Sequence, residues 1–325
     1  DGDCQGDLLI DGRLFVMFHA IAALCHTFLL LLISRDNVGA TTLNMFLAYA
    51  TAREYQKSWV FKVKQRGTKL LGIFCLLCVS SALVILGEPG AAARCDVIGS
   101  QIVGIVGCSV GWAVMLAAWA VCSAVLDACN MGVDAYSFSC MNRVLMLEQD
   151  IASESGDDTS ATSESFAVAG LVHEFNMLNA LVQVTSGHLQ LPILLYVKFT
   201  VMVFLIMMVT MPSLFASFGF GFPMVYNLGL IWAVVWLGLA AQFFSQVSSV
   251  NMKFMRLPTM LNGMDFGVEL DLTKNYVVQY IQTALLTQNC GFLIFNVVVT
   301  NRTFVKVFYY SLAVALHITT RFLGW

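Results

Sequence analysis

Long apolar runs, separated by short polar segments, dominate this chain. A helix needs roughly 20 residues to cross a hydrocarbon core of about 30 Å. Five runs meet this length: Leu14–Ser34, Leu70–Gly87, Ile102–Leu126, Leu191–Met211 and Val225–Ser248. Two weaker runs are Val38–Ala52 and Phe304–Phe322. Since backbone polar groups inside a bilayer must be satisfied within each segment, the pattern predicts an all-α membrane protein with seven transmembrane helices.

The composition agrees with a bilayer as the solvent. Hydrophobic residues make up 58% of the chain and charged residues 11%, and the mean hydropathy is +0.78. Soluble domains are roughly 45–50% apolar and about 25% charged. Seven spans leave little of the 325 residues for a separate soluble domain, so residues 1–325 are interpreted as a single membrane domain.

Lysine and arginine are concentrated on one side of the seven-span arrangement. If the N-terminus is cytoplasmic, the cytoplasmic segments hold Arg13, Arg53, Lys57, Lys62, Lys64, Arg66, Lys69, Arg143, Lys253, Arg256 and Lys274. The outer segments then hold Arg35, Arg94 and Arg321. The positive-inside rule therefore predicts a cytoplasmic N-terminus and an extracellular C-terminus. A G-protein-coupled receptor has the opposite orientation, which disfavours that class.

Three segments are predicted to lie in the cytoplasm. The stretch Glu148–Ser165 is acidic and rich in serine, and Ile151 is its one large apolar residue. It cannot bury enough apolar surface to fold, so we expect a mobile loop, either a solvated linker or a regulatory phosphorylation site. An amphipathic helix leading into the fifth span is predicted from apolar residues at steps of three and four, including Leu171, Phe175, Leu178, Val182 and Leu189. Tyr276–Gln288 predicts a short cytoplasmic helix before the last span, or a peripheral interfacial one.

The last run carries polar residues on one side. At helical spacing, one stripe collects Lys306, Tyr309, Tyr310, Ala313, Leu316 and His317. We call these six residues the polar stripe. Four copies around an axis would place apolar Ala313 and Leu316 as a constriction, with Tyr310 and His317 offering polar contacts to an ion. The polar stripe is therefore interpreted as pore-lining, and the alternative is a buried contact with another helix of the same chain.

Candidate ligand-binding residues lie in the outer halves of the second to sixth spans. They are Asn44, Gln101, Ser109, Trp112, Trp232 and Trp236. Hydrogen-bonding groups beside aromatic faces suit a small amphipathic molecule or a sugar, although a single tryptophan more often packs or anchors a helix. No catalytic constellation, phosphate loop or metal-ligand set can be assembled, so we expect no enzyme activity, no cofactor and no nucleic-acid partner.

The C-terminal stretch "YIQTALLTQNCGFLIFNVVVTNRTFVKVFYYSLAVALHI", residues 280–318, has a recognisable order. A short helix leads to the turn Cys290-Gly291-Phe292-Leu293, then to Asn296 in an apolar stretch, and then to Tyr310. This order resembles the C-terminal signature of the insect gustatory receptors and their gustatory receptor-like relatives. This chain has Asn296 where that signature has an acidic residue, and Leu316 or His317 where it has a glutamine. Residues 171–199 also resemble that family's approach to the fifth span.

The resemblance implies a chemosensory, ligand-gated cation channel in the plasma membrane. It implies a homotetramer in which the pore helix, about 302–322, lines a central pore, and cytoplasmic portions, about 166–190 and 250–300, anchor the subunits. Its partners would be a small-molecule ligand, permeating cations and membrane lipid. A secondary transporter of a small molecule is the alternative from another class, and it would usually show an internal repeat and paired charges at mid-depth.

Overall fold

The structure, a computed structural model, describes most of the chain outside the predicted first and fifth spans. The described residues are 24, 38–86, 97–153, 169–191, 224–264, 267–287, 290–294, 296–300, 302, 303, 305, 306, 309, 310, 313 and 317. Of the predicted spans, Leu14–Ser34 and Leu191–Met211 thus lie almost entirely outside the described residues, and Phe304–Phe322 is described at six positions.

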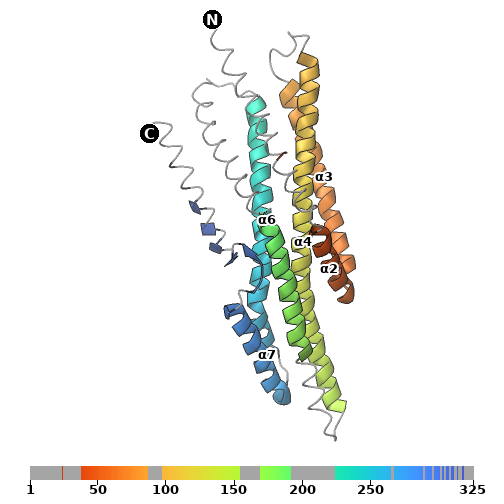
Figure 1. The fold of residues 1–325 in the computed structure, drawn as a ribbon, viewed down its shortest axis with the longest axis vertical. Helices are drawn as coiled ribbons and strands as arrows, with labels where there is room; N and C mark the ends of the chain where they lie inside the picture. The colour runs from red at the N-terminus through yellow and green to blue at the C-terminus, as the bar shows by residue number, and fades with distance from the viewer. Residues whose placement is uncertain are drawn as a thin grey trace.

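Long helices make up nearly all of the described chain (Figure 1). Their bounds are α2 Val38–Ala52, α3 Gln56–Leu86, α4 Val97–Ser153, α6 Met224–Asn262 and α7 Gly267–Thr287. Residues 169–191 form a further helix. The described sheet is a hairpin of two short strands, β1 Leu293–Ile294 and β2 Val297–Val298. The prediction of a mostly helical protein is confirmed.

Within the part of the chain that the structure describes, two helical segments are long and apolar enough to cross a membrane. They are Gln56–Leu83 and Ile105–Arg143, with only 22% and 44% of their most apolar windows buried inside the chain. An apolar helix with most of its surface left open is suited to a bilayer rather than to water. The structure thus supports a membrane protein, while seven spans and the sides of the termini stay predictions.

The helices continue well beyond the predicted spans. At about 1.5 Å per residue, the 57 residues of α4 extend for about 86 Å, far more than the roughly 30 Å of a hydrocarbon core. α3 likewise begins at Gln56, ahead of the predicted span start at Leu70. The loop predicted for residues 148–165 is wrong over residues 148–153, which are the last turns of α4, because Glu148, Gln149 and Ala152 favour a helix. Residues 154–165 lie outside the described part.

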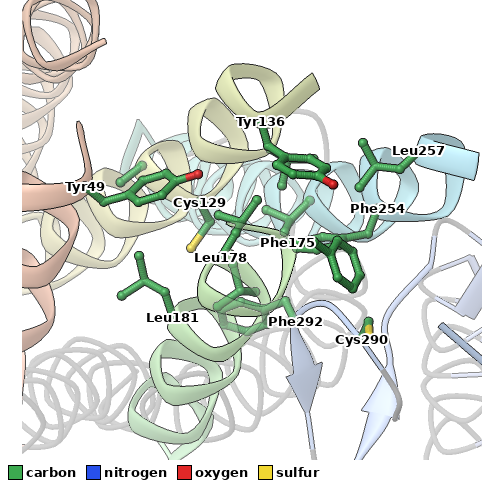
Figure 2. Packing of buried hydrophobic residues seen from close by; sticks show 14 of the residues in the cluster. Tyr49, Cys129, Tyr136, Phe175, Leu178, Leu181, Phe254, Leu257, Cys290 and Phe292 are labelled. Atoms are coloured by element: carbon green, nitrogen blue, oxygen red, sulfur yellow. The ribbon is translucent and has the colours of Figure 1, made fainter. Parts of the chain in front are cut away.

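α2 has the bounds predicted for the second span. The part of α4 that it contacts, however, lies beyond the predicted end of the fourth span. Its residue Tyr49 approaches Gly132 of α4 and belongs to a buried cluster with Cys129 and Leu178 (Figure 2). These α4 residues lie beyond Leu126, where the fourth span was predicted to end. α2 therefore contacts the extension of α4 beyond the predicted span. Its 15 residues extend for about 22 Å.

Two buried clusters hold the helices together. The larger one joins α2, the first turns of α3, α4, the 169–191 helix, α6, α7 and the hairpin, with Phe175 near its centre (Figure 2). The smaller one joins α3, α4 and α6 around Leu77, Trp112 and Trp119. We call the end of the bundle that contains the larger cluster the α7 end.

Candidate functional site

The chain enters the polar stripe from the hairpin that follows α7. β1 and β2 pair antiparallel, with Leu293 opposite Val298 and Ile294 opposite Val297. Asn296, in the turn between them, has a φ of 60°, a left-handed conformation that asparagine tolerates better than most residues. The apolar stretch of the resemblance is thus folded back on itself here, and Asn296 is its turn residue.

One buried side chain of α6 holds both ends of this hairpin. Asn251 is 1% exposed. Its Nδ2 donates to the carbonyl oxygens of Phe292 at 2.9 Å and Val299 at 2.8 Å, and its Oδ1 accepts from the backbone N–H of Phe292 at 2.6 Å. We call these three hydrogen bonds the Asn251 clasp. Since buried backbone groups must be paired, the clasp replaces the ladder bonds that so short a hairpin cannot make itself.

The residue before Phe292 must be glycine. Gly291 has a φ of +101°, and a Cβ there would lie 2.6 Å from Asn251 Oδ1. Its N–H donates to Asn179 Oδ1 of the 169–191 helix at 3.1 Å. The turn expected at Cys290-Gly291-Phe292 is therefore fixed by two asparagines, one from each of two different helices.

Aromatic packing joins the same elements. The ring of Phe175 lies 6.2 Å from that of Phe254 and 6.4 Å from that of Tyr280, both in edge-on geometry, and Phe292 is fully buried beside them (Figure 2). Tyr280 Oη also donates to Asn176 Oδ1 at 2.9 Å. The two stretches expected to form an anchor, about 166–190 and 250–300, thus pack together around the start of the terminal segment.

A buried carboxylate joins α3 to α4 near the predicted ends of their spans. Asp127, whose side chain is 2% exposed, lies 2.7 Å from the Arg66 guanidinium and 3.3 Å from the Lys62 ammonium. With its amide oxygen turned towards Arg66, Gln246 of α6 accepts from both guanidinium nitrogens at 2.6 Å and donates to Ser123 at 2.9 Å. Three helices therefore meet at one polar level.

This polar level coincides with boundaries predicted from hydropathy alone. Arg66 precedes the third span by one turn, Asp127 follows the fourth directly, and Gln246 lies two residues before the end of the sixth. Charged groups are expensive inside hydrocarbon, so paired charges are expected where a membrane span ends.

A second buried carboxylate lies deeper in the α7 end. Glu174, in the 169–191 helix, has a side chain 2% exposed; its Oε2 lies 2.8 Å from Arg53 and 3.7 Å from Arg143 and accepts from Ser139 Oγ at 3.3 Å. Burial raises the pKa of Glu174 above its usual range, although both arginines lower it. Arg53, which directly follows α2, and Arg143, in α4, thus both connect to the 169–191 helix through Glu174.

The described residues of the polar stripe lie on the outside of the chain. Tyr309 and Tyr310 are 67% and 65% exposed, with ring centroids 6.1 Å apart. Lys306, Ala313 and His317 are exposed as well, and Leu316 is not among the described residues. The five described residues of the polar stripe are thus exposed in the single chain, and the choice between a pore wall and a contact within one subunit stays a prediction.

Three of the six candidate ligand residues have described side chains. Trp112 is 1% exposed, and its Nε1 donates to Ser81 Oγ at 3.2 Å in the smaller cluster. Asn44 is exposed on α2, whose buried neighbours belong to the larger cluster, and Ser109 is half-buried on α4. Gln101, Trp232 and Trp236 lie in helices, but their side chains are outside the described part.

The residues that organise the site were not found by sequence reasoning. Asn179, Asn251, Asp127 and Glu174 are all buried polar residues inside helices. A polar residue on an otherwise apolar helix face was the available signal, because such a group must find a partner when buried. Among the described residues, no group of three or more His, Cys, Asp or Glu could hold a metal ion.

Comparison of the sequence with protein-family models and with curated proteins finds no match.

Proposed function

We propose that this chain is a subunit of a ligand-gated cation channel of the gustatory receptor-like type in the plasma membrane. In this proposal the terminal segment lines a central pore between identical chains, with four copies forming a homotetramer. The hairpin and its two asparagines then fix where each pore segment leaves the anchor.

The observation that carries the proposal is the exposure of the polar stripe. Lys306, Tyr309, Tyr310, Ala313 and His317 are all exposed in a single chain. A helix that turned an ammonium, two phenols and an imidazole to lipid would be strongly disfavoured, since a charge at the bilayer centre alone costs roughly 2.5–3.5 kcal/mol. Water in a shared pore would satisfy these groups.

The Asn251 clasp supports the same assignment. Asn251 belongs to α6, a helix that continues from a predicted span into the α7 end, and it binds the backbone on both sides of the hairpin. A movement of α6 relative to the 169–191 helix would therefore displace the hairpin and the segment that follows it. Ligand gating needs such a connection between the ligand-binding helices and the pore segment. A ligand opens a channel only if it binds one of two arrangements of this connection more tightly than the other.

The buried charges do not favour the transporter alternative. The ion pairs of Asp127 with Arg66 and Lys62 lie at the predicted inner ends of the spans. A coupling site in a secondary transporter lies near the bilayer midplane instead.

Thiol modification of the pore segment tests the proposal. The full chain carrying Ala313→Cys is reconstituted into planar bilayers, and agonists are sought in a panel of sugars, amines and aromatics. A charged, membrane-impermeant thiol reagent is expected to block the current through Ala313→Cys. The matched control is Phe308→Cys, which lies on the opposite side of the predicted helix, and the unsubstituted chain gives the background of its ten cysteines. Equal sensitivity of all three proteins would contradict a pore lined by the polar stripe.

Lys306 gives a second readout of the same segment. A ring of exposed ammonium groups at the inner mouth would repel permeating cations. Lys306→Gln is therefore expected to raise cation conductance and to increase the preference for cations over anions, as measured from reversal potentials in asymmetric salt. An unchanged conductance and reversal potential would place this side chain away from the ion path.

A further inference from the structure

Six cationic residues lie between positions 53 and 69, and the structure divides them into two groups. Arg53 lies 2.8 Å from buried Glu174, Arg66 lies 2.7 Å from buried Asp127, and Lys62 lies 3.3 Å from the same aspartate. These three cations neutralise carboxylates that would otherwise be buried with unpaired charge, although the Lys62 side chain is itself 46% exposed. Their role in the bundle is thus accounted for.

The other three cations, Lys57, Lys64 and Lys69, are exposed on α3. None of them forms an ion pair with the described residues. Lys57, Phe61 and Lys64 follow one another at steps of four and three, so they share one face of the helix, and Phe61 is 69% exposed between them. Lys69 is exposed as well, but it lies about 120° around the helix from Lys57. The result is a basic surface with one large apolar side chain at its centre.

The same exposed face continues along α3 as an apolar one. Leu71 and Val79 are 61% and 59% exposed, and Cys75 between them is exposed too. The change from basic to apolar falls between Lys69 and Leu71, inside the membrane-length segment Gln56–Leu83. A helix that passes from lipid headgroups into hydrocarbon needs this order of side chains, with an aromatic ring suited to the interface.

We propose that Lys57, Lys64 and Lys69 form a binding surface for the headgroups of anionic phospholipids at the N-terminal end of α3. The lysine ammonium groups would contact lipid phosphates while the Phe61 ring lies among the headgroups. A membrane fits this surface better than an acidic protein does, because the basic face runs without interruption into exposed Leu71 and Val79. The inference goes beyond the channel proposal and does not depend on ion conduction.

Lipid titration of the intact protein tests this surface. The full chain, purified in a neutral detergent, is titrated with phosphatidylglycerol or phosphatidylcholine, and bound lipids are counted by native mass spectrometry. Since each lysine near an anionic surface strengthens binding about fivefold, the variant Lys57→Gln/Lys64→Gln/Lys69→Gln is expected to bind phosphatidylglycerol about a hundredfold more weakly at low salt. Binding of phosphatidylcholine is expected to stay unchanged.

Two control variants separate a site from general charge. Lys57→Arg/Lys64→Arg/Lys69→Arg keeps the three charges and is expected to keep phosphatidylglycerol binding. Arg256→Gln/Arg302→Gln removes exposed charges elsewhere and is expected to keep it as well. Because all the substituted side chains are exposed, thermal unfolding in detergent should be the same for every variant, which excludes misfolding as the cause of a loss.

Three results would overturn the inference. One is equal affinity of the unsubstituted chain for the two lipids. Another is a loss in the control lacking Arg256 and Arg302 as large as in the triple glutamine variant. The third is displacement of phosphatidylglycerol by inorganic phosphate at similar concentration, which would assign the surface to soluble anions.

Discussion

Replacing Asn251 with leucine tests whether the clasp holds the terminal segment. Leucine has nearly the same size but no hydrogen-bonding groups, so the Phe292 N–H and the carbonyl oxygens of Phe292 and Val299 lose their partner. A buried donor or acceptor left unpaired costs about 1–3 kcal/mol. With partial relaxation of the three groups, Asn251→Leu should destabilise the docked hairpin by roughly 3–6 kcal/mol.

Hydrogen exchange measured by mass spectrometry reads this change locally. Peptides covering residues 290–300 should exchange about a hundredfold to ten-thousandfold faster in Asn251→Leu, since each 1.4 kcal/mol corresponds to a factor of ten. Peptides from the middle of α4 should keep their protection. Asn275→Ala, at an exposed position of α7, serves as the matched control and should leave the hairpin unchanged. If the peptides from Asn251→Leu exchange as slowly as those from Asn275→Ala, the clasp does not hold the hairpin.

Three further predictions concern the neighbouring groups. Gly291→Ala should lower the thermal unfolding midpoint markedly, because alanine is strained at a φ of +101° and its Cβ would overlap Asn251, whereas Gly107→Ala, with open space around it, should have little effect. Because burial raises the pKa of Glu174, the folded state binds its proton more tightly than the unfolded state does. Stability should therefore rise as pH falls from above the folded pKa towards the unfolded value of about 4.3, and Glu174→Gln should abolish this rise in urea titrations. Asp127→Leu should destabilise the chain by about 3–5 kcal/mol by leaving Arg66 unpaired, and Asp127→Leu/Arg66→Met should recover much of the loss; equal destabilisation by the single and double variants would contradict a buried pair.

The positions of several helices could be predicted from the sequence, but the ends of α3 and α4 could not. α2 has the predicted bounds, while α3 and α4 continue far into the α7 end. A search for apolar runs stops at the first charges, which are Lys69 before Leu70 and Asp127 after Leu126. The helices continue past these charges, and Arg66 and Asp127 pair with each other across the helix interface.

The anchor of the terminal segment could be predicted only in outline. The turn at Gly291 was expected from the resemblance, but its partners Asn251 and Asn179 lie 41 and 112 residues away from the groups they bind. A single asparagine in a helix has no periodicity that would reveal such a contact. Trp112 shows the converse difficulty, because an indole that packs against a neighbouring helix looks the same in sequence as one that lines a ligand site.

The central claim is that the polar stripe faces an axis shared by several identical chains. A three-dimensional reconstruction by electron cryomicroscopy of the full chain in lipid nanodiscs tests it most directly. The account predicts a four-fold ring with Tyr310 and Ala313 of every chain turned towards a central conduit. A monomer, or a ring in which these two residues face lipid, would contradict it.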